Sequence, residues 1–446
     1  MEKLFGTDGL RAIAGQFPLD YESVYVLGQT LIELLQHHGF PTQVIIGRDT
    51  RESGVWLEQA LVQGIQEKRG EAFLTGIIPT SAISFLTKKY SFSAGIVISA
   101  SHNPYQDNGI KIFSSQGTKI SEDWENQLEK AIKAKRKSIN RKNLSLSPMD
   151  SFGDDYLKFL KSKFQAPAHF PKFKIALDCS NGASTFFAPK VFKDLGFVVI
   201  TIGCSPNGKN INDGCGSLHP QTLAQAVIES KADIGIAYDG DADRAIWIDE
   251  KGKVLNGDHT LFVLAKFMKE RKRLKSSFVV ATTMSNLGLE KALEKLELKL
   301  YRAPVGDKYV LEEMIKLGTN LGGEQSGHTI FLDDCMTGDG ILTSLKMLEV
   351  MSCEKALLSE LVEDFEEYPQ ILLNVRVSRK EDFSHFSEIS QAVEEVKQNL
   401  SDCGRFHLRY SGTEPVARIM IEGRDQNQIE TMAQKIAALI HKYLGE

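Results

Sequence analysis

A serine with reactive neighbours follows a run of residues typical of a buried strand. Residues 98–104 read Ile-Ser-Ala-Ser-His-Asn-Pro, and the small polar residues at the end of this strand leave the hydroxyl of Ser101 exposed at a sheet edge. Ser101 is a candidate nucleophile, with His102 or Lys111 as its proton partner. The same residues are also typical of a Ser/Asn/Pro turn, so this stretch alone leaves both interpretations open.

Three aspartates alternate in a second stretch, where residues 239–244 read Asp-Gly-Asp-Ala-Asp-Arg after a strand pattern. Alternate residues of an extended segment point the same way, so the carboxylates of Asp239, Asp241 and Asp243 converge and repel one another. Arg244 is their one obvious cationic partner, and all-oxygen ligation favours one Mg²⁺ per chain over zinc. An EF-hand is disfavoured because Arg244 stands where that loop needs glycine and strands flank it, whereas a solvated acidic turn remains the alternative.

A glycine-rich stretch carries hydrogen-bonding side chains suited to a sugar. Residues 322–328 read Gly-Gly-Glu-Gln-Ser-Gly-His, between a helical pattern and a short strand. Glycines let the backbone approach a ligand closely, while Glu324, Ser326 and His328 offer groups that bind hydroxyls. A simple glycine-rich turn is the alternative.

The fourth stretch is rich in groups that bind phosphate. Residues 409–415 read Arg-Tyr-Ser-Gly-Thr-Glu-Pro, and Arg418 follows. Two guanidinium groups, two hydroxyls and a run of backbone N–H groups suit a phosphate dianion. A β-turn bearing surface arginines is the alternative.

Short strand patterns alternate with longer amphipathic helical patterns through most of the chain, which predicts an α/β fold with mixed or parallel sheets. The predicted strands are 43–47, 94–99, 173–177, 233–237 and 278–281, and the predicted helices are 21–36, 57–67, 221–230 and 259–268. Boundaries near residues 150, 255 and 368 predict four domains, 1–150, 151–255, 256–368 and 369–446, each with one of the four stretches. The last domain is predicted as α+β, in the order strand, helix, strand, strand, helix.

The composition is that of an ordinary globular protein, with 446 residues of which 42% are hydrophobic and 25% charged. A net charge of -5 gives no reason to expect nucleic acid or an anionic membrane as partner. The 6 cysteines have no metal-ligand spacing and are typical of reduced thiols. With no signal-peptide pattern or long apolar run, we expect a cytoplasmic protein that acts on a small molecule.

In this order and at these separations, the four stretches resemble the α-D-phosphohexomutase family. The likeness extends from residues 6–11, which read Gly-Thr-Asp-Gly-Leu-Arg, to residues 422–423. It implies a heart-shaped architecture of three related α/β domains and a smaller α+β C-terminal domain around a central cleft. It also implies that Ser101 carries a phosphate and, through it, binds Mg²⁺ together with Asp239, Asp241 and Asp243.

The resemblance also implies roles for further residues. The groups around the transferred phosphate would be Arg11, His102, Lys111 and Arg244. Glu324 and Ser326 would hold sugar hydroxyls, with His328 nearby. The phosphate that is not transferred would be held by Arg409, Ser411, Gly412, Thr413 and Arg418.

Three positions depart from the family pattern without removing a group that the mechanism needs. Ala12 stands where glycine is common, and Tyr410 where lysine is common. Ala242 replaces a glycine in the aspartate loop. If this position needs a positive φ, the alanine costs on the order of 1 kcal/mol in strain.

Residues 212–217, 305–310 and the glutamine of the third stretch resemble the bacterial branch of the family that interconverts glucosamine 6-phosphate and glucosamine 1-phosphate. This implies transfer through phospho-Ser101 and a bound 1,6-bisphosphate that turns end for end, a sugar 1,6-bisphosphate as activator, and a product that feeds UDP-N-acetylglucosamine and cell-wall precursor synthesis. Gln325 stands where phosphomannomutase and phosphoglucomutase relatives have methionine, and these two activities are the alternative within the family. The chain is expected to be a monomer or homodimer.

Two other classes of protein share parts of this pattern. In a metal-dependent phosphohydrolase, water would discharge phospho-Ser101, but a hydrolase gains little from the phosphate-binding groups near the C-terminus. A non-catalytic sugar-phosphate sensor would not need the serine. The complete set of groups therefore favours a mutase over both.

Overall fold

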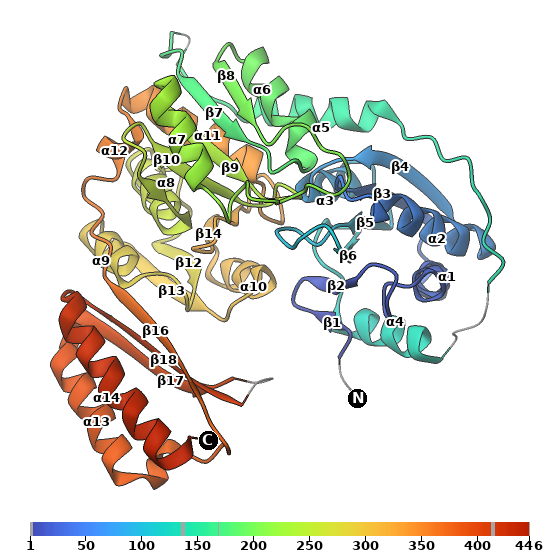
Figure 1. Ribbon diagram of the computed structural model, residues 1–446. Helices are drawn as coiled ribbons and strands as arrows, with labels where there is room; N and C mark the ends of the chain where they lie inside the picture. Colours follow the sequence, from blue (N-terminus) through green and yellow to red (C-terminus); the bar gives the residue numbers. More distant parts are fainter. Residues whose placement is uncertain (1–2, 135–138, 168, 412–414, 446) are drawn as a thin grey trace. The chain divides into compact units, whose positions relative to one another are not determined.

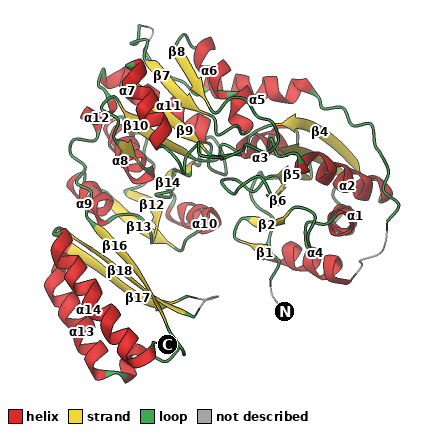
Figure 2. Ribbon diagram, in the orientation of Figure 1, coloured by secondary structure: helices red, strands yellow, loops and turns green. Residues whose placement is uncertain are grey.

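The computed structural model describes residues 3–134, 139–167, 169–411 and 415–445 (Figure 1). The chain forms two compact units, one of Met1–Ser285 with Glu297–Glu363 and one of Asn286–Leu296 with Asp364–Glu446. Sheets with helices packed against them recur in both units, as Figure 2 shows.

The N-terminal sheet of the first unit has the strand order β1-β2-β6-β5-β3-β4. Its strands are Phe5–Gly6 (β1), Gly9–Ile13 (β2), Gln43–Arg48 (β3), Glu71–Ile77 (β4), Ala94–Ile98 (β5) and Asp107–Ser114 (β6). β3 is parallel to β4 and β5, whereas β6 is antiparallel to β5 and β2. The helices of this part are Tyr21–His37 (α1), Ser53–Glu67 (α2), Thr80–Lys89 (α3) and Glu122–Ala134 (α4). Since every residue of β5 is buried, its end places the serine loop inside the protein.

A second sheet of the first unit has the order β11-β10-β9-β7-β8. Its strands are Lys174–Asp178 (β7), Val198–Ile202 (β8), Ile234–Tyr238 (β9), Ala245–Asp249 (β10) and Val254–Leu255 (β11). The helices are Asp150–Ser162 (α5), Ala188–Asp194 (α6) and Gln221–Ser230 (α7), with a 3-10 turn at Ala183–Phe186. β9 and β10 are buried throughout, as their apolar sequences predict, and residues 239–244 connect them.

The third sheet of the first unit has the order β13-β12-β14-β15. Its strands are Phe278–Thr282 (β12), Lys299–Ala303 (β13), Leu321–Gly323 (β14) and Thr329–Phe331 (β15). The helices are Gly257–Glu270 (α8), Asp307–Leu317 (α10), Gly340–Glu354 (α11) and Leu358–Leu361 (α12). The glycine-rich loop therefore connects the antiparallel pair β14 and β15.

The second unit contains a sheet with the order β16-β18-β17. Its strands are Gln370–Arg376 (β16), Gly404–Tyr410 (β17) and Val416–Gly423 (β18), and its helices are Leu287–Lys295 (α9), Ser387–Leu400 (α13) and Gln426–Leu444 (α14), with 3-10 turns at Phe383–His385 and Ser401–Cys403. Helices α13 and α14 pack on the sheet around a core that includes Ile419, Ile421, Ile429 and Ile436. From β16 onward, the strands and α-helices follow the predicted order.

The predicted strands overlap β3, β5, β7, β9 and β12, and the predicted helices overlap α1, α2, α7 and α8. The predicted α/β class is confirmed by sheets that combine parallel and antiparallel pairs with helices. The domain boundaries, the heart shape and the central cleft stay predictions. None of the helices in the described part of the chain is long and apolar enough to cross a bilayer.

Candidate active site

Ser101 lies in the loop after β5 and is fully buried, so the prediction that its hydroxyl is exposed at a sheet edge is wrong. Its backbone has the left-handed φ of 52°, which is uncommon for a residue other than glycine. The Oγ atom donates a hydrogen bond of 2.6 Å to Oδ2 of Asp239, and Nδ1 of His102 is 3.2 Å away. The structure therefore joins the candidate nucleophile on the N-terminal sheet to the first aspartate on the second sheet.

The three aspartates form a buried cluster with the donor set of a hard cation. One carboxylate oxygen each from Asp239, Asp241 and Asp243 lies within 4.8 Å of the others. Oδ1 of Asp241 and of Asp243 accept no hydrogen bond from any described residue. Burial, with the charges of Asp243 and Asp241 adding to it, raises the pKa of Asp239 well above its ordinary value. The residues present therefore fit a divalent metal that binds to oxygen.

Ala242 has a φ of 59°, so the condition for strain at this departure from the family pattern is met. Its carbonyl accepts a hydrogen bond of 2.9 Å from the backbone N–H of Gly340, at the start of α11. The helix thus holds the carbonyl of the strained residue in the aspartate loop.

Lys111 of β6 is the principal cation of the cluster. Its Nζ atom is 2.9 Å from Oδ2 of Asp241, 3.1 Å from Oδ2 of Asp243 and 3.4 Å from Oδ1 of Asp8. Burial opposes its charge, but these carboxylates outweigh burial and raise the pKa of Lys111 well above its ordinary value. The expectation that Arg244 is the one cationic partner of the aspartates is therefore wrong. Nε of Arg244 is 3.8 Å from Oδ1 of Asp243.

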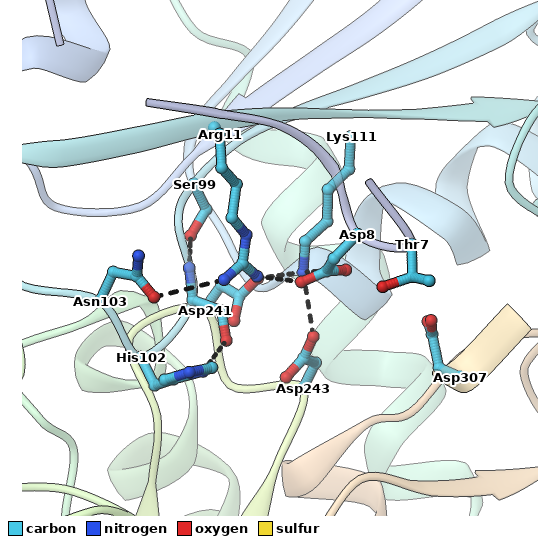
Figure 3. Close-up of polar contacts among 12 residues, drawn as sticks. Thr7, Asp8, Arg11, Ser99, His102, Asn103, Lys111, Asp241, Asp243 and Asp307 are labelled. Carbon is cyan, nitrogen blue, oxygen red and sulfur yellow. Dashed lines mark hydrogen bonds and ion pairs between the residues drawn. The ribbon is translucent and has the colours of Figure 1, made fainter. Parts of the chain in front are cut away.

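Arg11 and His102 complete the polar surroundings of Ser101. Figure 3 shows both residues together with Asp8, Asn103, Asp241 and Asp243. Arg11 is paired with Asp8 and donates a hydrogen bond of 3.3 Å to Oδ1 of Asn103. Burial, and then the positive charges of Arg244 and Arg11, lower the pKa of His102 to about 4. The imidazole is therefore neutral near pH 7. Of the two predicted proton partners, His102 is the one with a hydrogen-bond contact to Ser101 Oγ in the structure.

The glycine-rich loop adjoins the aspartate loop within the same unit. Arg244 and His328 form a β-bridge, and the N–H of Ala245 donates to the carbonyl of Gly327 at 3.2 Å. Ser326 Oγ donates to Glu324 Oε2 at 3.2 Å, so the two predicted sugar ligands lie together. The ring of His328 is buried, and its Nε2 accepts from the N–H of Gly338 at 3.2 Å.

Gln325 points its side chain at the start of α8. Its Nε2 atom donates a hydrogen bond of 3.1 Å to Oδ2 of Asp258, which is fully buried. The N–H of Gly257 donates to the Gln325 carbonyl at 2.9 Å. The amide of Gln325, which stands where other relatives have methionine, thus has a protein partner in the structure.

The arginines near the C-terminus lie on the second unit, which we describe by itself. Arg409 and Arg418 are directly opposite on the antiparallel strands β17 and β18. Like charges in this position repel, so a bound anion would offset their repulsion. Ser411 is buried, and Lys380 donates to its carbonyl at 2.6 Å. The predicted ligands Gly412 and Thr413 lie outside the described residues.

Several residues that contact the charged groups of the site were not predicted from the sequence. Thr80 donates from Oγ1 to Oδ2 of Asp241 at 2.6 Å, and Asp8 contacts both Arg11 and Lys111. Lys119 lies 2.6 Å from Asp307 and 3.1 Å from Asp8. Asp8 belongs to a stretch that contributed to the family resemblance, but the other contacts have no local signal in the sequence.

Comparisons with known proteins identify the family to which these features belong. Four models of phosphoglucomutase/phosphomannomutase match the chain, namely alpha/beta/alpha domain I at residues 2–138, domain II at 154–252, domain III at 256–368 and the C-terminal domain at 372–439. The chain belongs to the phosphoglucomutase/phosphomannomutase family. The resemblance inferred from the four stretches is thereby confirmed, and with it the assignment of the chain as a mutase, an enzyme of the isomerase class.

Particular relatives refine this placement. The phosphoglucosamine mutase of Solibacter usitatus is 43% identical over 444 residues, which cover 99% of each chain. Two solved structures share the fold at low identity. A phosphoglucomutase/phosphomannomutase family protein from Burkholderia thailandensis has a TM-score of 0.81 and 21% identity, covering 99% of this chain and 97% of that one. An Aspergillus fumigatus N-acetylphosphoglucosamine mutase, solved with GlcNAc-6P and magnesium, has a TM-score of 0.68 and 17% identity, covering 98% and 95%.

Proposed function

We propose that the protein interconverts glucosamine 6-phosphate and glucosamine 1-phosphate, with Ser101 as the phosphoryl carrier. The observation that carries the proposal is the hydrogen bond of 2.6 Å between Ser101 Oγ and Asp239, inside a cluster that also contains Lys111 and two further aspartates. The name of the Solibacter relative supports the hexosamine substrate. We place the reaction in the cytoplasm, before UDP-N-acetylglucosamine and cell-wall precursor synthesis.

In this mechanism phospho-Ser101 transfers its phosphoryl group to the free hydroxyl of a bound hexosamine phosphate. The P–O bond to Ser101 Oγ breaks, a P–O bond to the sugar oxygen forms, and the proton of the sugar hydroxyl passes in net terms to Ser101. Neutral His102, with Nδ1 3.2 Å from Ser101 Oγ, is placed to carry that proton. The 1,6-bisphosphate then turns end for end, and Ser101 accepts the other phosphoryl group. A sugar 1,6-bisphosphate would serve as activator, because it can phosphorylate Ser101 directly.

Asp239, Asp241 and Asp243 would hold the magnesium ion, together with the phosphate on Ser101. When bound, the ion offsets negative charge on the phosphoryl group. Arg11, Lys111 and Arg244 would add positive charge around the transferred phosphoryl group. Asp8 pairs with Arg11 and Lys111, and Asp243 pairs with Arg244. Arg409, Ser411, Gly412, Thr413 and Arg418 would hold the phosphate that is not transferred.

Substrate choice in this proposal depends on the loop of residues 324–328. Glu324 supplies the carboxylate that a protonated 2-amino group prefers, and Ser326 supplies a hydroxyl. Gln325 would act on specificity by fixing the loop against Asp258. A hydrogen bond to a charged group contributes about 1.5–3 kcal/mol, or roughly ten- to a hundredfold in rate preference.

The proposal is tested by measuring kcat/KM for the 6-phosphates of glucosamine, glucose and mannose side by side with magnesium and a sugar 1,6-bisphosphate. We expect glucosamine 6-phosphate to be preferred about ten- to a hundredfold, with weak activity on glucose phosphate. A higher value for mannose or glucose phosphate would keep the family and reject this substrate. Release of inorganic phosphate at the rate of isomer formation would instead indicate a phosphohydrolase.

A further inference from the structure

Arg51 is a fully buried arginine that the proposed mechanism does not use. It follows β3, its side chain is 0% exposed, and its Nε atom donates to Oδ2 of Asp49 at 2.9 Å. Burial outweighs the attraction of Arg51 and raises the pKa of Asp49 above its ordinary value. Burying a charged guanidinium costs free energy unless its five N–H groups are hydrogen-bonded. The positions of its hydrogen-bond partners therefore indicate the role of Arg51.

The other donors of Arg51 all point to the serine loop. Nη2 donates to the carbonyls of Ser101 at 3.0 Å and Asn103 at 2.8 Å. Nη1 donates to the carbonyl of Asp107 at 3.0 Å and also to that of Pro104. Together with the bond to Asp49, every N–H of the guanidinium has an acceptor, and most of these acceptors are backbone carbonyls between residues 101 and 107.

A second set of bonds fixes the same peptide groups. Nδ2 of Asn212 donates to the Ser101 carbonyl at 2.9 Å and to the Asn103 carbonyl at 3.0 Å. Ser99 Oγ donates to Asp49 Oδ2 at 2.6 Å and accepts from the Ser101 N–H at 2.9 Å. Asp49 and Arg51 thus reach both the N–H and the carbonyl of Ser101.

These hydrogen bonds matter because Ser101 has the left-handed φ of 52°. This conformation is strained for a serine and persists only when surrounding contacts stabilise it. Its carbonyl is also tightly enclosed, since a Cβ atom at Gly240 would lie 2.6 Å from it. We propose that Arg51 is a positioning residue for phosphoryl transfer, which holds the Ser101 carbonyl so that Oγ faces Asp239. This inference rests on the proposed role of Ser101 as phosphoryl carrier.

The planar fork of Arg51 is the property that this role requires. A lysine keeps the positive charge beside Asp49 but has one nitrogen, which cannot meet carbonyls spread over residues 101–107. Arg51→Lys should therefore lower kcat on the order of 10- to 100-fold, the effect of a misplaced reacting group. KM for glucosamine 6-phosphate should stay within about twofold, because the side-chain hydrogen bonds of Arg51 go to Asp49 and to the serine loop rather than to the proposed sugar ligands Glu324 and Ser326.

The test compares R51K with the matched control Arg273→Lys, at saturating magnesium and glucose 1,6-bisphosphate and well below both melting temperatures. Arg273 pairs with the buried Glu349 at 2.7 Å in the same unit and has no contact to the serine loop. The expected result is a loss of kcat in R51K alone. The rate at which glucose 1,6-bisphosphate phosphorylates Ser101, monitored by intact-protein mass spectrometry, should fall by the same factor. A kcat within twofold of wild type for R51K would overturn the proposal.

Asn212→Gly gives an independent arm if R51K does not fold. Asn212 has a φ of 59°, which glycine adopts without strain, so this change removes the amide that holds the Ser101 carbonyl. N212G should lower kcat about 3- to 10-fold at unchanged KM, and wild-type kcat would overturn the proposal. Ser101→Ala separates the two hypotheses, because an active S101A rejects the proposed function, whereas an inactive S101A with fully active R51K and N212G rejects positioning alone.

Discussion

Lys111 is the buried cation of the aspartate cluster, and its replacement by methionine should make the stability of the protein depend strongly on a divalent cation. Its ammonium lies 2.9 Å from Asp241, 3.1 Å from Asp243 and 3.4 Å from Asp8. Removing one partner of a buried ion pair costs about 3–5 kcal/mol, because the other charge is left without compensation. For a unit of this size, each kcal/mol shifts Tm by about 2 °C or less. In the presence of a chelator, Tm of K111M should therefore fall on the order of 5 °C.

Magnesium should restore most of this loss. In the wild-type protein, Lys111 already offsets the charge of the carboxylates that would bind the ion, so added magnesium raises Tm only moderately. In K111M the ion is the main remaining compensation for the aspartates. The increase in Tm on adding magnesium should thus be several degrees larger in K111M than in the wild-type protein, although K111M is expected to be inactive.

The assay is calorimetry of both proteins with chelator and with saturating magnesium. Lys119→Met is the matched control, since Lys119 is paired with Asp307 and Asp8 but has no contact to Asp241 or Asp243. K119M should lose stability in both conditions and keep the wild-type response to magnesium. Equal responses of K111M and wild type would refute the argument that Lys111 and the metal compensate the same carboxylates.

Two further predictions concern the metal and pH. Removing divalent metal should stop isomerisation, and magnesium should restore it, since Oδ1 of Asp241 and of Asp243 accept no hydrogen bond within the described residues. Full activity in a sample verified to be metal-free would assign the aspartates another role. Burial raises the pKa of Asp339 from 3.8 to about 6, so its contribution to stability is fully present below pH 3.8 and is lost as pH rises through 6. Tm of wild type relative to Asp339→Asn should fall on the order of 5 °C between pH 4 and 7, and a constant difference would contradict the assignment.

Elements and motifs that are contiguous in the chain could be predicted from the sequence. β5 and β9 are runs of buried residues, so their apolar sequences identify them directly. The serine and aspartate loops follow these strands, and their side chains have chemistry that few plain turns need. By contrast, β1 and β11 have two residues each and form because they pair with β2 and β10, which no local pattern shows.

The contacts that assemble the site could not be predicted, because they join distant parts of the chain. Lys111 and Asp241 are 130 positions apart, and Thr80 and Asp241 are 161 positions apart. Only packing of the N-terminal sheet on the second sheet brings these residues together. Because the local sequence does not show this packing, it offers Arg244 as the one cationic partner of the aspartates and misses Lys111. Gln325 shows a related limit, since the sequence places it in the glycine-rich loop but does not show its hydrogen bond to Asp258.

The most direct test of the central claim is to follow labelled phosphate through Ser101. The protein is incubated with magnesium and glucose 1,6-bisphosphate that carries labelled phosphate, and the modified residue is identified by peptide mass spectrometry. We predict label on Ser101 that is lost on adding glucosamine 6-phosphate and recovered in a hexosamine bisphosphate, and we predict that S101A has neither label nor turnover. Turnover without label on Ser101, or S101A activity above a few per cent of wild type, would contradict the account.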